Sequence, residues 1–227
     1  MNYFFRCGCP ACNPPSLQFT GRDSYVCDGP SCKSLITTPA LSNKFSCPTC
    51  RKPQSMTLRQ LQSLELNALG VLDKNLLAKD NLGRLLTSTL LPALSTLTSC
   101  PAWPAVRQPA PALRKLIVQI AESTANFALG YEHSKALSSP PLIDLHPEPC
   151  HPWRATQMYR TGTLLAILGT MQSDEEYLSQ AKEMLAMARE LGKKSHGVES
   201  DFLKKVEERI RDVNNDWRRE DFDGGAR

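Results

Sequence analysis

The sequence lacks long hydrophobic runs and long runs of like charge. No apolar stretch among its 227 residues approaches the roughly 18 residues needed to span a bilayer, and no charged-then-apolar leader opens the chain. No five consecutive residues share one charge sign, so the sequence has no strongly acidic or basic tail. These absences argue against membrane and secreted classes, and we expect a soluble protein without a membrane partner.

The sequence also lacks the short motifs of common enzyme chemistry. It has no Gly-rich phosphate loop, no His-Glu-x-x-His pair and no Gly-x-Ser-x-Gly nucleophile turn. Only four histidines are present, and we interpret each as structural. His146, Cys150 and His151 lie close together, but prolines interrupt them and no fourth ligand is evident. We therefore assign no metal site to this stretch.

Cysteine is the residue type that stands out, since seven of nine lie in the first fifty positions. Four of them form two close pairs, Cys27 with Cys32 and Cys47 with Cys50, separated by fourteen residues. Two such pairs on the arms of a short hairpin suit tetrahedral zinc, so we predict a four-cysteine zinc ribbon. A disulfide framework is the alternative, which the missing secretory signal disfavours. Reduced thiols indicate the cytoplasm, the nucleus or both.

Zinc should decide whether this module folds. Binding of zinc by such peptides releases about 10–16 kcal/mol near neutral pH. A typical whole domain is stable by only about 5–15 kcal/mol. We therefore expect Cys47→Ser to unfold residues 27–50 and to leave the helices intact, because the helices should have a separate core.

A second group of cysteines, Cys7, Cys9 and Cys12, supplies only three ligands where a structural zinc normally has four. The group is either incomplete or takes a ligand from elsewhere. Cys100 and Cys150 are left over; we expect each to be a buried free thiol, although either could be the borrowed ligand. We expect this group to bind zinc weakly or not at all in this chain.

The segment around that trio resembles the post-SET segment of the SET-and-MYND family of protein-lysine methyltransferases. The residues that carry the resemblance are Tyr3-Phe4-Phe5-Arg6-Cys7-Gly8-Cys9-Pro10-Ala11-Cys12. The resemblance implies a fourth zinc ligand from an upstream SET domain, and a stacking role for Phe5 on the adenine of S-adenosylmethionine. It also implies a helical, tetratricopeptide-like domain, which two later stretches fit loosely: Leu145-His146-Pro147 through His151-Pro152 to Tyr159 and Gly162, and Ser195-His196-Gly197.

The catalytic parts of that family are missing from this sequence. No Asn-His-Ser/Cys motif of the SET knot is present, so we expect the C-terminal portion of such a protein, inactive alone. S-adenosylmethionine would then bind only if the SET core were supplied, and Phe5 would otherwise be a plain strand residue. The alternative is a stand-alone zinc-ribbon adaptor that contacts nucleic acid weakly. Residues 1–53 hold six Lys/Arg against two Asp/Glu, a net charge of +4, but we favour a solvated basic surface over nucleic-acid contact as the explanation.

The rest of the chain has helical periodicity. We predict helices over about 56–68, 152–169, 173–192 and 199–219, with Ser173 as an N-cap and glycines 169 and 192 as helix ends. A leucine stripe continues to residue 94 across Pro92, which should kink or bound it. A further helix should start near Pro111 and carry Phe127 on its apolar face.

The predicted fold class is therefore mainly α, in three parts. A small cysteine-rich zinc module fills residues 1–53, a tetratricopeptide-like helical domain fills residues 54–220, and a polar tail follows over 221–227. Stacked helices present a concave surface, so we expect a protein partner or substrate to bind the helical domain.

Overall fold

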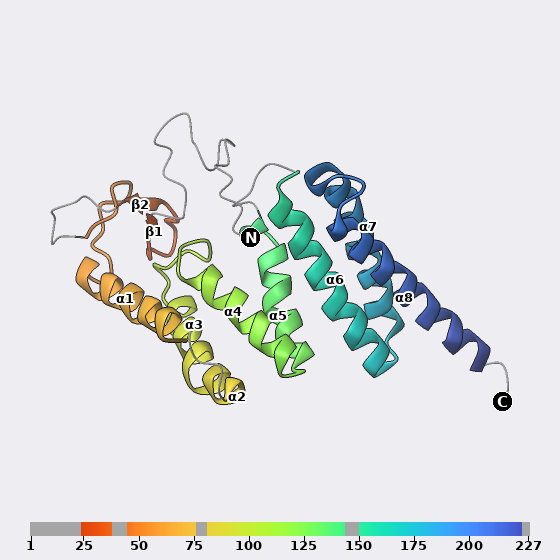
Figure 1. Cartoon of the computed structure of the whole chain (residues 1–227). Helices are drawn as coiled ribbons and strands as arrows, with labels where there is room; N and C mark the ends of the chain where they lie inside the picture. The colour runs from red at the N-terminus through yellow and green to blue at the C-terminus, as the bar shows by residue number, and fades with distance from the viewer. Residues whose placement is uncertain (1–23, 38–44, 76–80, 144–149, 224–227) are drawn as a thin grey trace. The chain divides into compact units, whose positions relative to one another are not determined.

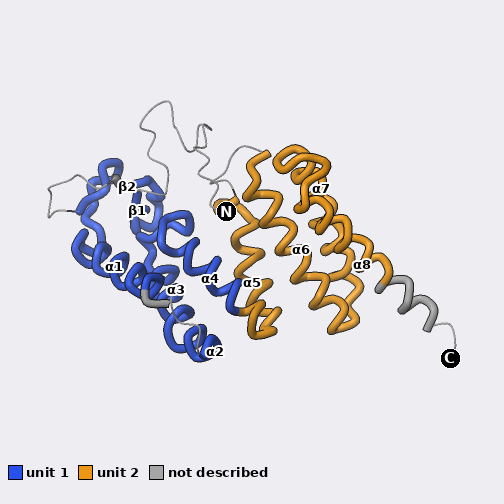
Figure 2. The backbone as a smooth tube through the Cα atoms, viewed as in Figure 1, with its two compact units in different colours: residues 1–120 blue, residues 121–227 orange. Residues whose placement is uncertain are grey.

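The computed structural model describes residues 24–37, 45–75, 81–143 and 150–223, and these are mainly helical, as predicted (Figure 1). The chain divides into two compact units, residues 1–120 and 121–227 (Figure 2). None of the described helices is long and apolar enough to cross a membrane. The predicted boundary after residue 53 stays a prediction.

The described part of unit 1 begins with two short strands and continues with helices. The strands pair antiparallel, with Tyr25 opposite Ile36. The elements in order are β1 (Ser24–Val26), β2 (Leu35–Thr37), α1 (Leu58–Asn75), α2 (Leu82–Leu85), the π-helical turn η1 (Leu86–Leu90), α3 (Leu91–Thr98) and α4 (Ala110–Ser123). The strand–turn–strand at the start holds the first pair of cysteines.

Helix α1 begins with a reciprocal cap. The Thr57 hydroxyl accepts a hydrogen bond from the Gln60 amide at 3.3 Å, and the Gln60 side chain accepts one from the Thr57 amide at 2.8 Å. This capping box satisfies two backbone donors that have no partner inside the helix. The helix runs to Asn75, beyond the predicted end at residue 68.

Pro92 marks the point where the leucine-rich stretch changes its winding. A proline inside a helix has no N–H, and its ring clashes with the carbonyl four residues earlier. Here the turn before it widens into η1, and Leu91 donates its N–H to the Leu86 carbonyl at the end of that turn. The prediction that Pro92 would kink or bound the helix is confirmed.

The helix predicted to start near Pro111 begins at Ala110, but it does not reach Phe127. It ends where Ala125 adopts a left-handed conformation with φ 54°, and the amide of Asn126 donates to the Ala121 carbonyl at 2.8 Å. A left-handed residue at the end of a helix is usually glycine, and here it is alanine. The prediction was wrong for Phe127, which instead opens α5 (Phe127–Ser138) after its N-cap, Asn126.

Unit 2 contains the last residues of α4, then α5 and three longer helices. They are α6 (Pro152–Gln172), α7 (Glu175–His196) and α8 (Asp201–Asp223). A Cβ added to Gly162 would lie 3.1 Å from Leu185 Cγ, so the missing side chain lets α6 and α7 approach closely. The core between α6 and α7 contains Leu178, Ala181, Leu185 and Ala188, all fully buried.

The predicted helix ends in this unit were displaced by packing. Gly169 and Gly192 lie inside α6 and α7, because Leu178 and Phe202 pack against their bare Cα atoms: an added Cβ would lie 2.8 Å from each side chain. The N-cap of α7 is Asp174, whose carboxylate accepts from the Tyr177 amide at 3.0 Å. Ser173, predicted as the cap, instead follows α6 with φ 52°.

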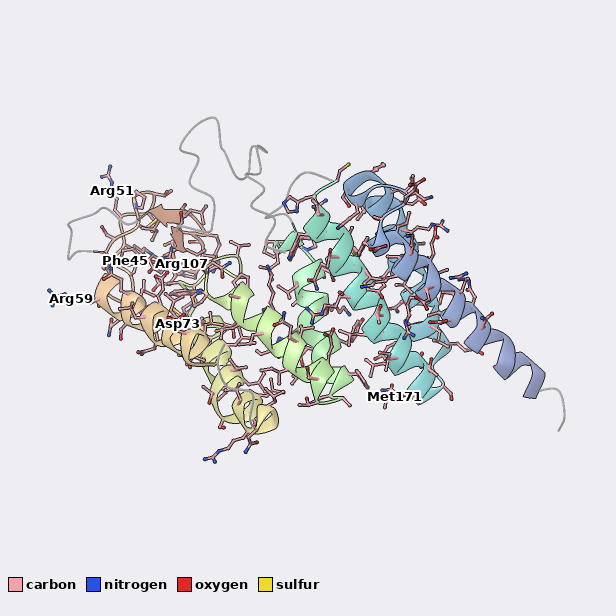
Figure 3. The ribbon with its side chains drawn as sticks, viewed as in Figure 1. Phe45, Arg51, Arg59, Asp73, Arg107 and Met171 are labelled. Carbon is pink, nitrogen blue, oxygen red and sulfur yellow. The ribbon has the colours of Figure 1, made fainter. Side chains whose placement is uncertain are left out.

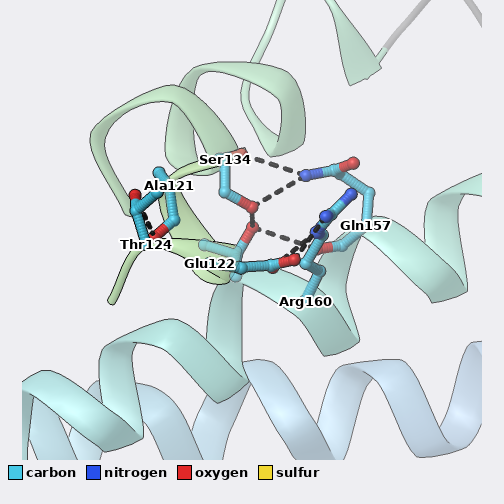
Figure 4. A network of polar contacts seen from close by, with 7 residues as sticks. Ala121, Glu122, Thr124, Ser134, Gln157 and Arg160 are labelled. Atoms are coloured by element: carbon cyan, nitrogen blue, oxygen red, sulfur yellow. Dashed lines mark hydrogen bonds and ion pairs between the residues drawn. The ribbon is translucent and has the colours of Figure 1, made fainter. Parts of the chain in front are cut away.

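Buried polar groups join α5 and α6 (Figure 4). The hydroxyls of Ser134 and Thr161 lie 2.8 Å apart, and Gln157 Nε2 donates to Ser134 Oγ at 2.9 Å. Beside them, Arg160 donates two hydrogen bonds to the Glu122 carboxylate, one of them from Nε at 2.6 Å. The buried donors and acceptors of this network therefore find partners within unit 2, which is what burial of polar groups requires.

Candidate metal centre

The first cysteine pair lies on the turn between β1 and β2. Cys27 directly follows β1 and donates its amide to the Ser34 carbonyl at 2.9 Å. Within the turn, Cys32 donates its amide to the Gly29 carbonyl at 3.0 Å. The strand pairing and the tight turn together bring Cys27 and Cys32 to the same end of the hairpin.

The second pair lies on a similar turn closed by the bridge between Ser46 and Pro53. Cys47 donates its amide to the Lys52 carbonyl at 3.0 Å and accepts at its own carbonyl from the Arg51 amide at 2.8 Å. Arg51 takes a left-handed conformation, φ 59°, directly after Cys50. This turn reverses the chain within a few residues and leaves both sulfurs on one side of it.

The four sulfurs form one cluster. The Sγ atoms of Cys27, Cys32, Cys47 and Cys50 all lie within 4.8 Å of one another, and no other such cluster of His, Cys, Asp or Glu occurs among the described residues. Across the two turns, Cys27 faces Cys50 at 3.6 Å and Cys32 faces Cys47 at 3.7 Å. Ligands about 2.3 Å from a tetrahedral zinc lie about 3.8 Å apart, so the spacing fits the ion.

The same distances exclude a disulfide among these four sulfurs. All four cysteines are free, and a disulfide needs sulfurs about 2.05 Å apart. The disulfide alternative is therefore wrong for this group.

Backbone amides act on the sulfurs of the cluster. Gly29 donates its N–H to Cys27 Sγ at 3.4 Å. The amide of Ser34 acts to lower the pKa of Cys32, the amides of Cys50 and Thr49 that of Cys47, and the amide of Lys52 that of Cys50. Donors aimed at a sulfur stabilise its thiolate form, which is the form that binds metal.

The thiols do not ionise equally. The hydroxyl and amide of Ser34 lower the pKa of Cys32 to about 6, and the amide of Cys50 lowers the pKa of Cys47. The amide of Lys52 also lowers the pKa of Cys50, but desolvation and the neighbouring sulfurs together raise it to about 11. Four thiolates this close repel one another, so a bound dication is what allows all of them to ionise.

An aromatic residue precedes each cysteine turn: Tyr25 lies two residues before Cys27, and Phe45 lies two residues before Cys47. The Tyr25 ring packs edge-on to Phe45 at 5.6 Å and to Trp103 at 5.7 Å between centroids. Figure 3 marks Phe45 and, from the turn before α4, Arg107. Within the cluster, Cys27 and Cys47 are fully buried, whereas Cys32 and Cys50 are half-buried.

The other residues singled out from the sequence lie outside this cluster or outside the described part of the chain. Cys7, Cys9, Cys12, Phe5 and His146 lie outside the described residues. Cys100 is buried, as expected, with its Sγ 3.4 Å from Met56 Sδ, but Cys150 is exposed, which corrects the expectation of a buried thiol. His151 Nδ1 accepts from the Trp153 amide at 3.1 Å, so this histidine caps α6.

Two residues near the cysteine turns, Gln54 and Arg107, could not be predicted from any spacing pattern in the sequence. Gln54 contacts both cysteine turns, and Arg107 approaches Tyr25 from far along the chain. No protein-family model matches the sequence, and no curated protein is similar enough to it to count as a match.

Proposed function

We propose that Cys27, Cys32, Cys47 and Cys50 hold one zinc ion as a structural centre. The observation that supports this is the cluster of four free cysteine sulfurs, all within 4.8 Å of one another. Tetrahedral sites with four sulfur ligands suit zinc or iron, and four protein ligands leave no open position for catalysis. The ion would fix the two turns relative to each other and thereby hold β1 and β2 in place.

Metal content of the purified chain tests this proposal. Native mass spectrometry with elemental analysis should find one zinc in the wild type and one in Cys150→Ser, a control that removes an exposed cysteine outside the cluster. Cys47→Ser should lose that zinc. Equal zinc content in Cys47→Ser and the control would contradict the assignment.

We further propose that the chain serves as the protein-interacting C-terminal portion of a SET-and-MYND-like methyltransferase. The support is the resemblance of residues 3–12, together with the helical domain that follows them. Methyl transfer needs an aligned amine and a preorganised cofactor site, which the family places in its SET core. The 227-residue chain should therefore transfer no label from S-adenosylmethionine to histones or cytosolic proteins. Transfer above background that disappears in Phe5→Ala would contradict this.

Contact with nucleic acid is a second candidate, which the surface of the cysteine module favours. Lys33, Arg51 and Lys52 are exposed, as is Arg59 at the start of α1, and Figure 3 shows Arg51 and Arg59 pointing outward. Binding through phosphates should weaken with salt: the logarithm of the binding constant should fall with the logarithm of the salt concentration, with a slope of about −0.9 per phosphate neutralised on duplex DNA. Gel-shift titrations at several salt concentrations would test it, and binding that ignores salt or does not occur would rule it out.

A further inference from the structure

Gln54 connects the two cysteine turns. Its Oε1 accepts a hydrogen bond from the Asp28 amide in the first turn at 2.9 Å. Its Nε2 donates to the Lys52 carbonyl in the second turn at 3.3 Å, and its own backbone amide donates to the Phe45 carbonyl at 3.0 Å. One side chain thus spans the pair of turns whose relative position defines the metal centre.

The same Nε2 also points at a metal ligand. It lies 3.5 Å from Cys27 Sγ and donates to it. The Asp28 N–H determines the orientation of the Gln54 side-chain amide. Because this N–H needs an acceptor, Oε1 faces it, and the amino group Nε2 then faces the sulfur. A flipped amide would place its oxygen against a thiolate and its amino group against another N–H.

Cys27 is one of the two cysteines of the cluster for which such a donor matters most. Its side chain is fully buried, so water cannot solvate its negative charge. A zinc ion with four thiolates carries a net charge of about −2, and N–H donors disperse that charge over the surrounding protein. Among the described residues, the donors to Cys27 Sγ are the Gly29 amide and Gln54 Nε2.

A neighbouring contact holds the first turn against the same segment. The Ser55 amide donates to Asp28 Oδ2 at 2.7 Å. Gln54 and Ser55 therefore fix the residue after Cys27 from two directions, and α1 begins shortly afterwards at Leu58. The position of Gln54 is set by backbone partners on both turns, which is the condition for an effective outer partner of a metal ligand.

We propose that Gln54 is a positioning residue of the metal centre: its amide ties the two cysteine turns together, donates to the Cys27 thiolate and so determines how tightly the ion is held. The inference rests on the proposed zinc function. It assigns a role in metal affinity to a side chain that is not itself a ligand. Loss of such outer partners typically costs about 10- to 100-fold in metal affinity.

Two substitutions separate the contributions of Gln54. Gln54→Leu removes all three side-chain hydrogen bonds at similar size, and Gln54→Glu keeps an acceptor for the Asp28 amide but places a negative charge beside Cys27. Gln62→Glu is the matched control, because it adds the same charge at an exposed position of α1. The affinity for zinc would be measured by competition with a chelator, and the centre would be probed by the absorption bands of bound Co²⁺.

We expect the dissociation constant for zinc to rise about tenfold in Gln54→Leu and about 100-fold in Gln54→Glu, with Gln62→Glu unchanged. The thiolate-to-Co²⁺ absorption band should shift in both Gln54 variants, a change that a purely structural role would not produce. Zinc affinity within twofold of wild type in Gln54→Leu, with an unshifted band, would overturn the inference. A wild-type chain that binds no metal would instead refute the proposed zinc function itself.

If Gln54→Glu does not fold, Gln54→Leu decides alone, through its dissociation constant for zinc and its Co²⁺ absorption band.

Discussion

The guanidinium carbon of Arg107 lies 4.0 Å from the ring centroid of Tyr25, two residues before the first cysteine of the cluster. The same guanidinium donates to the Tyr25 hydroxyl at 3.2 Å and pairs with Glu65 of α1 at 3.0 Å. On the backbone, Val26 of β1 donates its amide to the Ala102 carbonyl at 2.9 Å. The metal module and the helices of unit 1 therefore share one core.

This shared core changes the expected effect of losing the metal. Cys47→Ser should not only unfold residues 27–50 but also loosen the start of α1 and the turn around Arg107, because Tyr25 would lose its position. Hydrogen exchange should become faster in these segments and stay slow in α6 and α7, which have their own core. Exchange confined to residues 27–50 would show that the helices of unit 1 are independent, and Cys150→Ser serves as the control.

Replacement of Arg107 should destabilise unit 1. Arg107→Met removes hydrogen bonds to Tyr25 and to the Glu65 carboxylate, and it leaves that carboxylate, 27% exposed, without its cation. Hydrogen bonds to charged groups are worth about 1.5–3 kcal/mol, so we expect a loss of about 2 kcal/mol in urea unfolding. Arg59→Met, at an exposed position, should change stability by less than about 0.5 kcal/mol. Equal effects of the two substitutions would contradict the role of Arg107.

Much of the fold could be predicted from local spacing. The cluster of four sulfurs follows from two close cysteine pairs, and the helices follow from apolar periodicity, because both patterns involve residues that are close in the sequence. Gln54 and the contact between Tyr25 and Arg107 could not be predicted, since they depend on where distant segments meet. The roles of Cys7, Cys9, Cys12 and Phe5 stay predictions.

Helix ends were harder to predict, because the same residue type serves two purposes. Glycine was expected to end helices at residues 169 and 192, yet at both positions it admits a packed side chain from the next helix. Conversely, Ala125 adopts the left-handed conformation that normally signals a glycine. Only the tertiary packing decides between these uses.

Alkaline pH should weaken unit 1 through Tyr25. Burial raises the pKa of Tyr25 above its ordinary value of 10.0, despite the opposing charge of Arg107. The folded state then keeps a proton that the unfolded state releases, so stability is complete below pH 10.0 and falls as the pH rises toward the folded pKa. Urea unfolding of zinc-loaded protein between about pH 9 and 11 should show this decline. Tyr25→Phe should reduce the decline of the unfolding free energy with pH. An identical decline in both proteins would refute the assignment.

Two glycine substitutions should change the stability of the protein in opposite directions. Gly169→Ala would place a methyl group 2.8 Å from Leu178 Cγ and 3.1 Å from its backbone nitrogen, so α7 must move away from α6. Overpacking of this kind costs about 1–3 kcal/mol. Gly70→Ala in α1 meets nothing within 4 Å, and should stabilise its helix by about 0.5–1 kcal/mol. Thermal unfolding would check both, and a stabilising Gly169→Ala would show that the two helices are not in close contact there.

The coordination of bound zinc tests the central claim most directly. X-ray absorption at the zinc edge, on protein loaded with one equivalent of zinc, should find four sulfur neighbours at about 2.3 Å and no nitrogen or oxygen neighbour. The same measurement on Cys47→Ser should lose that shell while Cys150→Ser retains it. A mixed shell of sulfur with nitrogen or oxygen in the wild-type protein would contradict a centre built from Cys27, Cys32, Cys47 and Cys50.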